Sequence, residues 1–183
     1  GYNETALFMF VKCEEPDIEQ LVANGSDLGP LWEDDSVEIF LQTADNIFYQ
    51  FIVNSKSARW NGHYVNGKRT ATQLELLALW NAATHIGDDF WSLELRVPWT
   101  TLDCEMPPRE LRGNIARNIR TSSYGENSTW SRLKNSFLDF ANFNRFVFNE
   151  DALTPELARE VEKTLTNYWS SILLRKANCM SVG

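Results

Sequence analysis

The sequence predicts an all-β protein, an antiparallel β-sandwich of the immunoglobulin or jelly-roll kind, with one α-helix added at its C-terminus. Two observations predict the sandwich. Several short stretches alternate between apolar and polar side chains, which is the period of a strand that buries one face. Turn-forming Gly, Pro, Asn and Asp residues separate these stretches, and helical periodicity is scarce in the part of the chain that contains them.

The first expected strands surround a long loop. Residues 6–13 are apolar on both faces, as in a strand that is covered on each side. Residues 14–30 hold several Gly and Pro residues and predict a loop, with one helical turn near residues 18–22. Two alternating strands, residues 36–42 and 48–54, then form a hairpin around a short polar turn.

The second half of the sandwich is less regular. Residues 55–72 predict a loop with at most a small hairpin, and residues 74–80 fit either a short helix or a strand. Residues 82–86 reverse through Gly87-Asp88-Asp89 into a regular strand at 90–97, and another strand is expected at 113–119. The segment from Trp130 to Phe148 is rich in aromatic residues and Asn.

The hairpin has two chemically different faces. One face is apolar and is expected to join the core; it carries Val37, Ile39, Leu41, Tyr49, Phe51 and Val53. The other face carries Glu38, Gln42, Gln50 and Asn54 on neighbouring strands, close enough for contact across the hairpin. A carboxylate in mid-strand with Trp32 shortly before it predicts a binding face with a hydrogen-bonding floor.

The chain is expected to divide into a sandwich at residues 1–151 and an amphipathic helix with a tail at residues 152–183. Thr154-Pro155-Glu156 is a helix start, with a hydroxyl cap and proline at the first helical position. Apolar residues then recur at helical spacing and form one stripe. This stripe either docks on the sandwich or belongs against another domain.

Composition excludes several classes of partner. The formal net charge is −8 and the pI is about 4.8, and the Lys and Arg residues are scattered, which disfavours nucleic acid. No apolar run approaches the roughly 20 residues of a membrane helix, so no membrane partner is expected. Cys13, Cys104 and Cys179 stand at irregular spacings, allow at most one disulfide, and are expected to be buried or free thiols.

Catalysis and bound cofactors find little support in the residue pattern. Asp34, Asp35 and Glu38 could suggest a pair of hydrolase carboxylates, but nothing else supports catalysis, so no catalytic residue is expected. No cofactor is required. Calcium is a weak possibility at Asp34 and Asp35, because no twelve-residue calcium loop is present. Haem held by a Met and a His is an open alternative, with Met9 or Met106 and His63 or His85.

Core packing explains most of the aromatic residues, but three of them have a different setting. Trp32, Trp60 and Phe137 stand in loops or at strand ends beside polar groups. Flat rings in such places can stack on the apolar face of a sugar while nearby amides and carboxylates bond its hydroxyls. These residues therefore predict a carbohydrate site.

Four motifs then match a known family in order and spacing. They are Trp-x-x-Asp-Ser-Val-Glu-Ile-Phe at residues 32–40, Gln-Phe-x-Val-Asn at 50–54, Trp-x-Leu-Glu-Leu-x-Val-Pro-Trp at 91–99, and Trp130-Ser131 ahead of Phe143. Over residues 6–148 the chain resembles carbohydrate-binding module family 9, whose sandwich is of the DOMON-like kind. The resemblance implies a β-sandwich that binds sugars without cleaving them.

The resemblance also implies site residues. Two aromatic residues, here Trp32 and Phe137, would hold a sugar ring between them, while Glu38, Asn54 and Asn135 would bond its hydroxyls. Together with Gln50 from the hairpin face, these form the expected carbohydrate site. The family's arginine falls on Ile52, so a charged donor is missing, and Arg96 or Lys134 is a candidate to replace it.

Partners and location follow from the same resemblance. The expected partner is an oligo- or polysaccharide, and a catalytic domain of a polysaccharide-degrading enzyme is expected in the same parent chain. Such a module would be extracellular or periplasmic, although the sequence does not open with a basic and then apolar signal. Two alternatives stay open, a structural or interdomain sandwich that has lost sugar binding and a haem-binding sandwich of the DOMON type.

Overall fold

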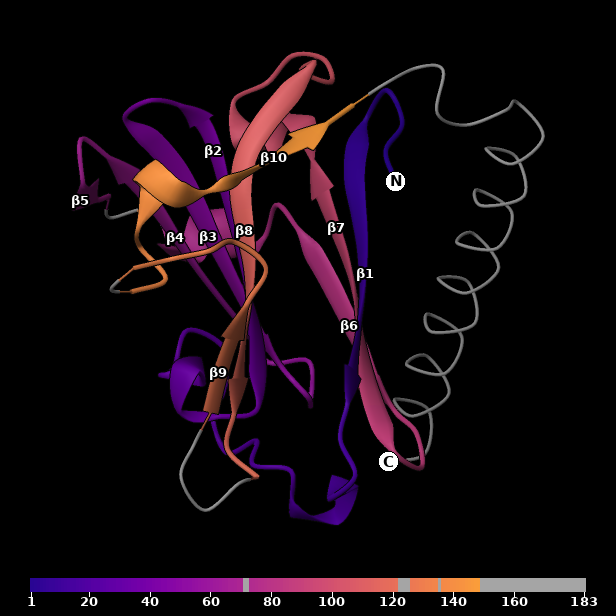
Figure 1. Ribbon diagram of the computed structural model, residues 1–183. Helices are drawn as coiled ribbons and strands as arrows, with labels where there is room; N and C mark the ends of the chain where they lie inside the picture. Colours follow the sequence, from indigo (N-terminus) through magenta and orange to yellow (C-terminus); the bar gives the residue numbers. More distant parts are fainter. Residues whose placement is uncertain (71–72, 122–125, 135, 149–183) are drawn as a thin grey trace, which may run out of the picture. The chain divides into compact units, whose positions relative to one another are not determined.

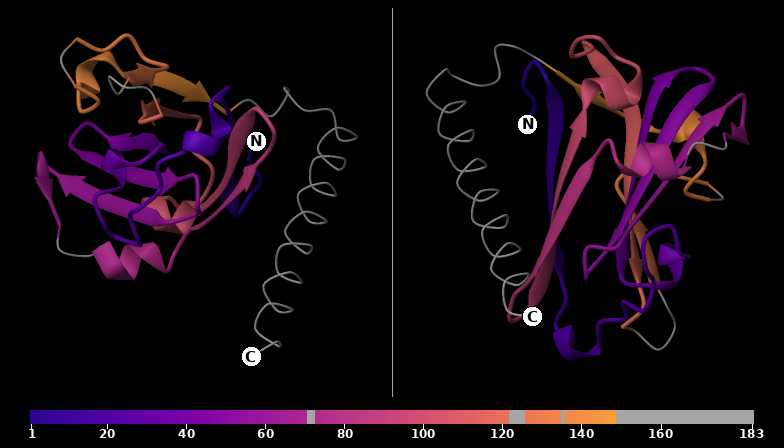
Figure 2. Two further views of the ribbon diagram at one scale, coloured as in Figure 1. Left: turned by 90° about the horizontal axis from the view of Figure 1, so that it is seen from below. Right: turned by 180° about the vertical axis from the view of Figure 1, so that it is seen from behind.

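The computed structural model describes residues 1–70, 73–121, 126–134 and 136–148. They form antiparallel sheets that lie in two layers, with few helices (Figures 1 and 2). The predicted all-β sandwich is therefore confirmed. The predicted C-terminal helix and the domain boundary at residue 151 lie outside the described residues.

The smaller sheet has three strands in the order β1-β7-β6. They are β1 (Ala6–Glu14), β7 (Phe90–Pro98) and β6 (Asn81–Ile86). The β6–β7 hairpin forms where the sequence predicts a reversal, and Gly87 N–H donates to the carbonyl of Phe90 across the turn. Alternation along β7 places Trp91, Leu93 and Leu95 in the core.

The larger sheet has seven strands, six of them in the order β10-β8-β2-β3-β4-β5, with β9 paired to β8. Its strands are β2 (Ser36–Ala44), β3 (Ile47–Asn54), β4 (Arg59–Val65), β5 (Lys68–Arg69), β8 (Glu110–Ile119), β9 (Glu126–Thr129) and β10 (Asn144–Val147). β10 pairs with the first part of β8 and β9 with its last part. The predicted β2–β3 hairpin forms around a short turn.

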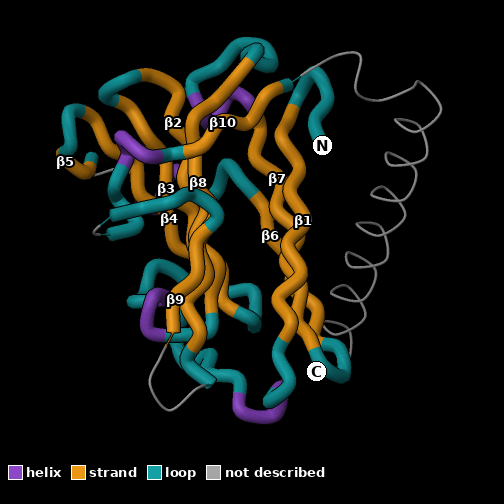
Figure 3. The backbone as a smooth tube through the Cα atoms, in the orientation of Figure 1, coloured by secondary structure: helices purple, strands orange, loops and turns teal. Residues whose placement is uncertain are grey.

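Helices in the described residues are short, as the tube drawing shows (Figure 3). They are η1 (Ile18–Gln20), η2 (Leu31–Glu33), α1 (Gln73–Leu77), η3 (Trp99–Leu102) and η4 (Phe140–Asn142). η1 falls within the predicted helical turn, and α1 settles the open choice for residues 74–80 in favour of a helix. None of these helices is long and apolar enough to cross a membrane.

The main core lies between the two sheets. It holds the predicted apolar face of the β2–β3 hairpin, and these residues meet the inward face of β7. The buried members from the two sheets are Val37, Ile39, Leu41, Tyr49, Phe51, Val53, Leu111, Leu7, Cys13, Trp91, Leu93, Leu95 and Val97. Each large apolar side chain buried here contributes about 1.5–3 kcal/mol to the stability of the fold.

One prediction about the larger sheet is only partly correct. The sequence predicts a loop with at most a small hairpin at residues 55–72, and the short β4–β5 hairpin does form there, but β4 is a strand of seven residues that pairs with β3 along its whole length. Its inward positions carry Asn61 and His63, so the apolar alternation that marks a strand is missing. Asn61 is buried because its Oδ1 accepts the Trp80 indole N–H at 3.1 Å and its Nδ2 donates to the carbonyl of Gln73 at 2.9 Å. Such bonds let a polar side chain occupy a core position.

The outer face of the larger sheet is covered rather than open. Two small apolar clusters lie on it, one around Leu31, Ile52 and Trp60 and one around Phe40, Ala116 and Phe143. The predicted hydrogen-bonding floor is therefore largely buried, with Glu38 only 4% exposed. The polar residues of this outer face lie between the two clusters.

The described cysteines are free thiols. Cys13 is buried in the main core and Cys104 is half-buried. Burial raises the pKa of the Cys13 thiol to about 11, which keeps it protonated at neutral pH. Cys179 lies outside the described residues.

Candidate functional site

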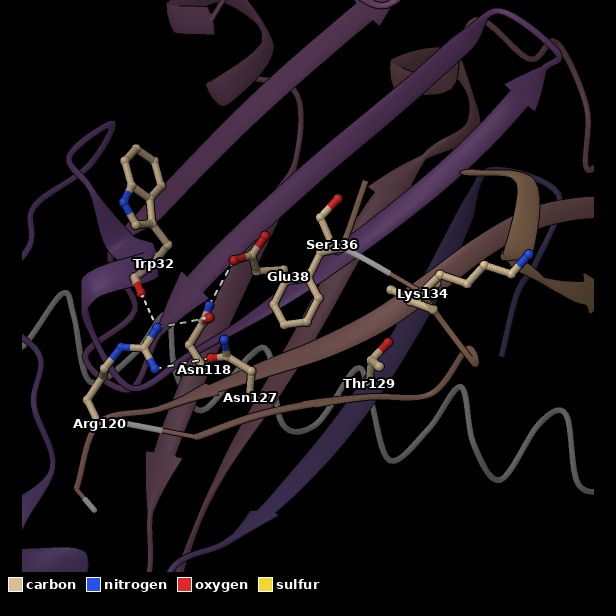
Figure 4. A pocket seen from close by; sticks show the side chains of 10 residues that line it. Trp32, Glu38, Asn118, Arg120, Asn127, Thr129, Lys134 and Ser136 are labelled. Atoms are coloured by element: carbon tan, nitrogen blue, oxygen red, sulfur yellow. Dashed lines mark hydrogen bonds between the residues drawn. The ribbon is translucent and has the colours of Figure 1, made fainter. Parts of the chain in front are cut away.

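A pocket of about 490 Å³ opens on the outer face of the larger sheet. Its ten lining residues come from η2, β2, the end of β8, β9 and the segment after β9 (Figure 4). They are Trp32, Glu38, Asn118, Arg120, Asn127, Thr129, Leu133, Lys134, Ser136 and Phe137. Trp32, Glu38 and Phe137 were predicted from the sequence, and the fold brings these three to one pocket.

Glu38 forms the floor of the pocket. Its two carboxylate oxygens accept hydrogen bonds from Asn118 Nδ2 and Gln50 Nε2, each at 2.8 Å. Burial raises the pKa of the Glu38 carboxyl above its ordinary value of 4.5, and the two amides and Arg120 oppose that rise. Each oxygen keeps a further lone pair, so the carboxylate can still accept a hydroxyl from a ligand.

Gln50 acts behind Glu38 rather than in the pocket wall. It lies on β3, is 8% exposed, and its Oε1 accepts the hydroxyl of Tyr64 at 3.1 Å. That bond fixes the amide so that its nitrogen faces Glu38. Gln50 therefore contributes to the site indirectly, because it orients the carboxylate of Glu38.

Trp32 presents a fixed ring at one side of the pocket. It lies in η2, and 43% of its surface is exposed. Its ring packs against Trp60 in a T-shaped contact, with centroids 6.0 Å apart. Trp60, which the sequence singled out as a second exposed candidate, is instead buried in the cluster with Leu31 and Ile52 and supports Trp32.

Phe137 lines the same pocket from the segment that follows β9. Its ring makes a T-shaped contact with Phe40, with centroids 6.5 Å apart, and Phe40 is fully buried on β2. In Figure 4 the neighbouring Ser136 and Trp32 are seen on either side of Glu38. Asn135, predicted as a hydrogen-bonding partner beside Phe137, lies outside the described residues.

Asn54 is not among the residues that line the pocket. It is fully buried at the end of β3, and its Nδ2 donates to Asp34 Oδ2 at 2.8 Å. Its Oδ1 accepts the backbone N–H groups of Lys56 and Ala58. The structure therefore gives this predicted site residue a role in holding a turn and the loop before β2.

Arg96 lies in the other layer of the sandwich. It is on β7 between Leu95 and Val97, which point into the core, so its own side chain is on the outer face of the smaller sheet. The pocket is on the outer face of the larger sheet. Arg96 therefore cannot replace the missing arginine at Ile52, and Ile52 itself is fully buried.

Two cations do line the pocket, Arg120 and Lys134. Lys134 was a sequence candidate, and Figure 4 shows its ammonium extending away from Glu38. Arg120 was missed, as was Asn118. Alternation along the predicted strand at residues 113–119 places Asn114, Ala116 and Asn118 on one face, but only the pairing of β8 with β2 brings that face beside Phe40, Glu38 and Ser36.

Asp34 and Asp35, the weak calcium candidates, are buried and bonded to N–H groups. Asp34 accepts the backbone N–H groups of Asn24 and Gly25, each at 2.9 Å. Asp35 accepts those of Val22 and Arg120, each at 2.8 Å. Within the described part of the chain, no group of three or more Asp, Glu, His or Cys side chains could hold a metal ion.

Comparison with known proteins gives matches only among solved structures. No protein-family profile matches the chain, and no curated protein matches it either. A family 9 carbohydrate-binding module from Caldicellulosiruptor kristjanssonii, in complex with glucose, is 17% identical with a TM-score of 0.59, over 84% of this chain and 77% of that chain. The fold is that of carbohydrate-binding module family 9.

Two further structures agree. The same kind of module from C. kristjanssonii in complex with cellotriose is 16% identical with a TM-score of 0.57, over 84% of this chain and 76% of that chain. A candidate carbohydrate-binding protein from Bacteroides uniformis is 17% identical with a TM-score of 0.63, over 80% of this chain and 74% of that chain. The resemblance that the sequence motifs indicate thus extends to the fold, and the site must be argued from its own residues.

Proposed function

We propose that this chain is a non-catalytic sugar-binding domain. A sugar ring would stack on Trp32, with Phe137 on its other side, and Glu38 would accept hydrogen bonds from its hydroxyls. The observation that carries the proposal is a pocket in which a firmly supported and 43% exposed tryptophan stands beside a carboxylate held by two amides. Flat apolar faces and convergent polar groups are the combination that a pyranose requires.

The comparisons support the same class of ligand. Two of the structures with this fold hold glucose and cellotriose. For this chain we propose a glycan partner of that kind, and a role as an accessory module of a secreted protein that degrades polysaccharides. A catalytic domain in the same parent chain and an extracellular or periplasmic location belong to this proposal.

The absence of catalysis is part of the proposal. A glycosidase needs two carboxyl groups free to act on either side of the bond that is cleaved. Glu38 lines the pocket, but Asp35 is fully buried and accepts two backbone N–H groups. Turnover of a glycoside that disappears in Asp35→Asn would overturn this part.

Isothermal titration calorimetry with glucose and cellotriose tests the binding site. We expect Trp32→Ala and Glu38→Gln each to weaken binding by about tenfold or more, since about 1.4 kcal/mol of lost interaction has that effect. Trp130→Ala is the matched control, because Trp130 is 48% exposed but lines a different pocket, about 300 Å³ in volume, beside β1. Equal binding by the wild type and both site variants would show that the site is wrong.

The second candidate function is a structural or interdomain sandwich without sugar affinity. It is favoured by one observation, that Ile52 occupies the position of the expected arginine and is packed with Leu31 and Trp60. The side chain at position 52 therefore supplies no charged hydrogen-bond donor to the site. Failure of the wild type to bind any sugar on a glycan array would favour this second candidate.

A further inference from the structure

Arg120 joins three segments at the wall of the pocket. Its Nη2 donates to the backbone carbonyl of Trp32 at 2.8 Å and to Asn118 Oδ1 at 3.2 Å. Its Nη1 donates to the carbonyls of Ile119 and Glu126 and to Asn127 Oδ1, at 3.0, 3.3 and 3.1 Å. One side chain thus connects η2, the end of β8 and β9 (Figure 4).

These contacts leave the Nη atoms of Arg120 little capacity for a ligand. A guanidinium has four N–H bonds on its two Nη atoms, and here they face five acceptors in the protein. All five acceptors are uncharged carbonyl or amide oxygens. The arrangement is therefore suited to holding the walls of the pocket in place rather than to gripping a sugar.

Arg120 also determines how Asn118 faces Glu38. The Asn118 amide oxygen accepts Arg120 Nη2, while its nitrogen donates to Ser36 Oγ at 3.1 Å and to Glu38 Oε1 at 2.8 Å. A flipped amide would turn its NH₂ group toward the guanidinium and its oxygen toward the carboxylate, which is unfavourable on both sides. The guanidinium therefore fixes the floor of the pocket as well as one of its walls.

We propose that Arg120 is the positioning residue of this site, which fixes the Trp32 backbone and the Asn118 amide relative to Glu38 without itself bonding the sugar through its Nη atoms. The predicted effect of Arg120 on affinity rests on the proposed sugar-binding function. The predicted stabilisation of the segment around Trp32 does not, and it can be measured without any sugar.

The first experiment measures affinity for cellotriose by calorimetry in Arg120→Ala, Asn118→Ala and the double variant. We expect about a tenfold loss or more from Arg120→Ala. The combined loss in the double variant should be smaller than the product of the two single losses, because Arg120 acts partly through Asn118. A full product would show that Arg120 does not act through Asn118 and would overturn that part.

Conservative variants separate positioning from charge. Arg120→Lys keeps the charge but cannot reach five acceptors, so we expect it to lose most of the affinity that Arg120→Ala loses. Arg117→Lys is the matched control, since Arg117 lies near the end of β8, three residues before Arg120, but pairs with Glu15 at 2.9 Å and lines the other pocket. Full affinity in Arg120→Lys would show that charge alone matters and would overturn the proposal.

The second experiment uses hydrogen exchange in the absence of sugar. In η2 the backbone N–H groups of Glu33 and Asp34 bond the carbonyls of Pro30 and Leu31. We expect these amides to exchange about tenfold faster in Arg120→Ala and to be unchanged in Arg117→Lys, because only the first variant releases the Trp32 carbonyl. Unchanged exchange in Arg120→Ala would overturn the proposal whatever the protein binds.

The two experiments keep the two conclusions apart. If the wild type does not bind cellotriose or glucose but exchange rises in Arg120→Ala, the sugar-binding function fails and the hold on Trp32 stands. If the wild type binds and Arg120→Ala binds equally well, the function stands and the positioning role fails.

Discussion

Glu38 shows how a single residue can depend on groups from several strands. Its carboxylate lies on β2, and the two amides that hold it come from β3 and β8. A buried carboxylate without such donors would bind a proton instead of staying charged. Burial shifts the pKa of Glu38 upward, and the two amides and Arg120 oppose that shift by favouring the charged carboxylate.

This pKa shift predicts opposite effects of pH on binding and on stability. Sugar binding should weaken as the pH falls through the raised pKa, above 4.5, because the protonated carboxyl loses acceptor strength. The folded state binds this proton more tightly than the unfolded state does. The contribution of Glu38 to the free energy of unfolding is therefore largest below pH 4.5 and is lost as the pH rises through the raised pKa.

Calorimetry with cellotriose at a series of pH values checks this prediction. Glu38→Gln should bind more weakly than the wild type, and its affinity should stay constant over the pH range in which the wild type loses affinity, because the amide does not titrate. The same pH dependence in wild type and Glu38→Gln would assign the titration to another group.

At the scale of elements, the loop that leads from β1 to β2 is fixed by buried carboxylates rather than by regular structure. Asp34 accepts two backbone N–H groups of this loop and the side-chain amide of Asn54. Asp35 links Val22 to the backbone of Arg120. The position of Trp32 therefore depends on two acids that do not touch the pocket.

We expect Asp34→Ala to lower the free energy of unfolding by about 3 kcal/mol. The substitution leaves three donors without their charged acceptor, and each unsatisfied buried donor costs about 1–3 kcal/mol before relaxation. Urea denaturation of the purified protein measures the difference. Asp45→Ala, at an exposed position in the β2–β3 turn, is the control and should change stability by less than about 0.5 kcal/mol.

Calcium binding at Asp34 and Asp35 is still only a weak prediction from the sequence. The hydrogen bonds that these two carboxylates accept lead us to expect no effect of calcium on stability. N–H groups point at their oxygens, and the positive ends of these dipoles occupy the directions from which a cation would bind. We expect the same Tm in excess calcium and in excess EDTA. A rise of the Tm with calcium that Asp34→Asn abolishes would contradict this expectation.

For the whole molecule, the important feature is that the larger sheet buries both of its faces. The inner face meets the smaller sheet, and loop segments cover much of the outer face with two small clusters. The pocket lies between these clusters. Sugar binding and folding should therefore depend on the same long-range contacts.

A shortened chain of residues 1–151 tests the domain division, which stays a prediction. We expect it to unfold in one cooperative transition and to bind cellotriose as the full chain does, because the main core contains residues spread from Tyr2 to Phe148. Circular dichroism during heating and calorimetry measure the two properties. Loss of binding in a folded short chain would favour the interdomain hypothesis, with the C-terminal segment as its functional surface.

Much of the fold could be predicted from local pattern. The apolar alternation of Val37, Ile39 and Leu41 correctly placed the hairpin in the core, and the turn at Gly87 placed β6 beside β7. The full length of β4 was missed because Asn61 is buried by bonds to residues far along the chain, which no local period reveals.

For the site, the sequence by itself determined which residues share the outer face of the hairpin and that Trp32 precedes it, since side-chain direction in a strand follows from its period. Only the tertiary structure decided that Asn118 and Arg120 complete the pocket, that Asn54 supports a loop, and that Arg96 is in the other layer. The reason is physical. Pairing of Ser36 with Asn118 joins residues 82 positions apart, and such a contact depends on the register of whole strands rather than on neighbouring residues.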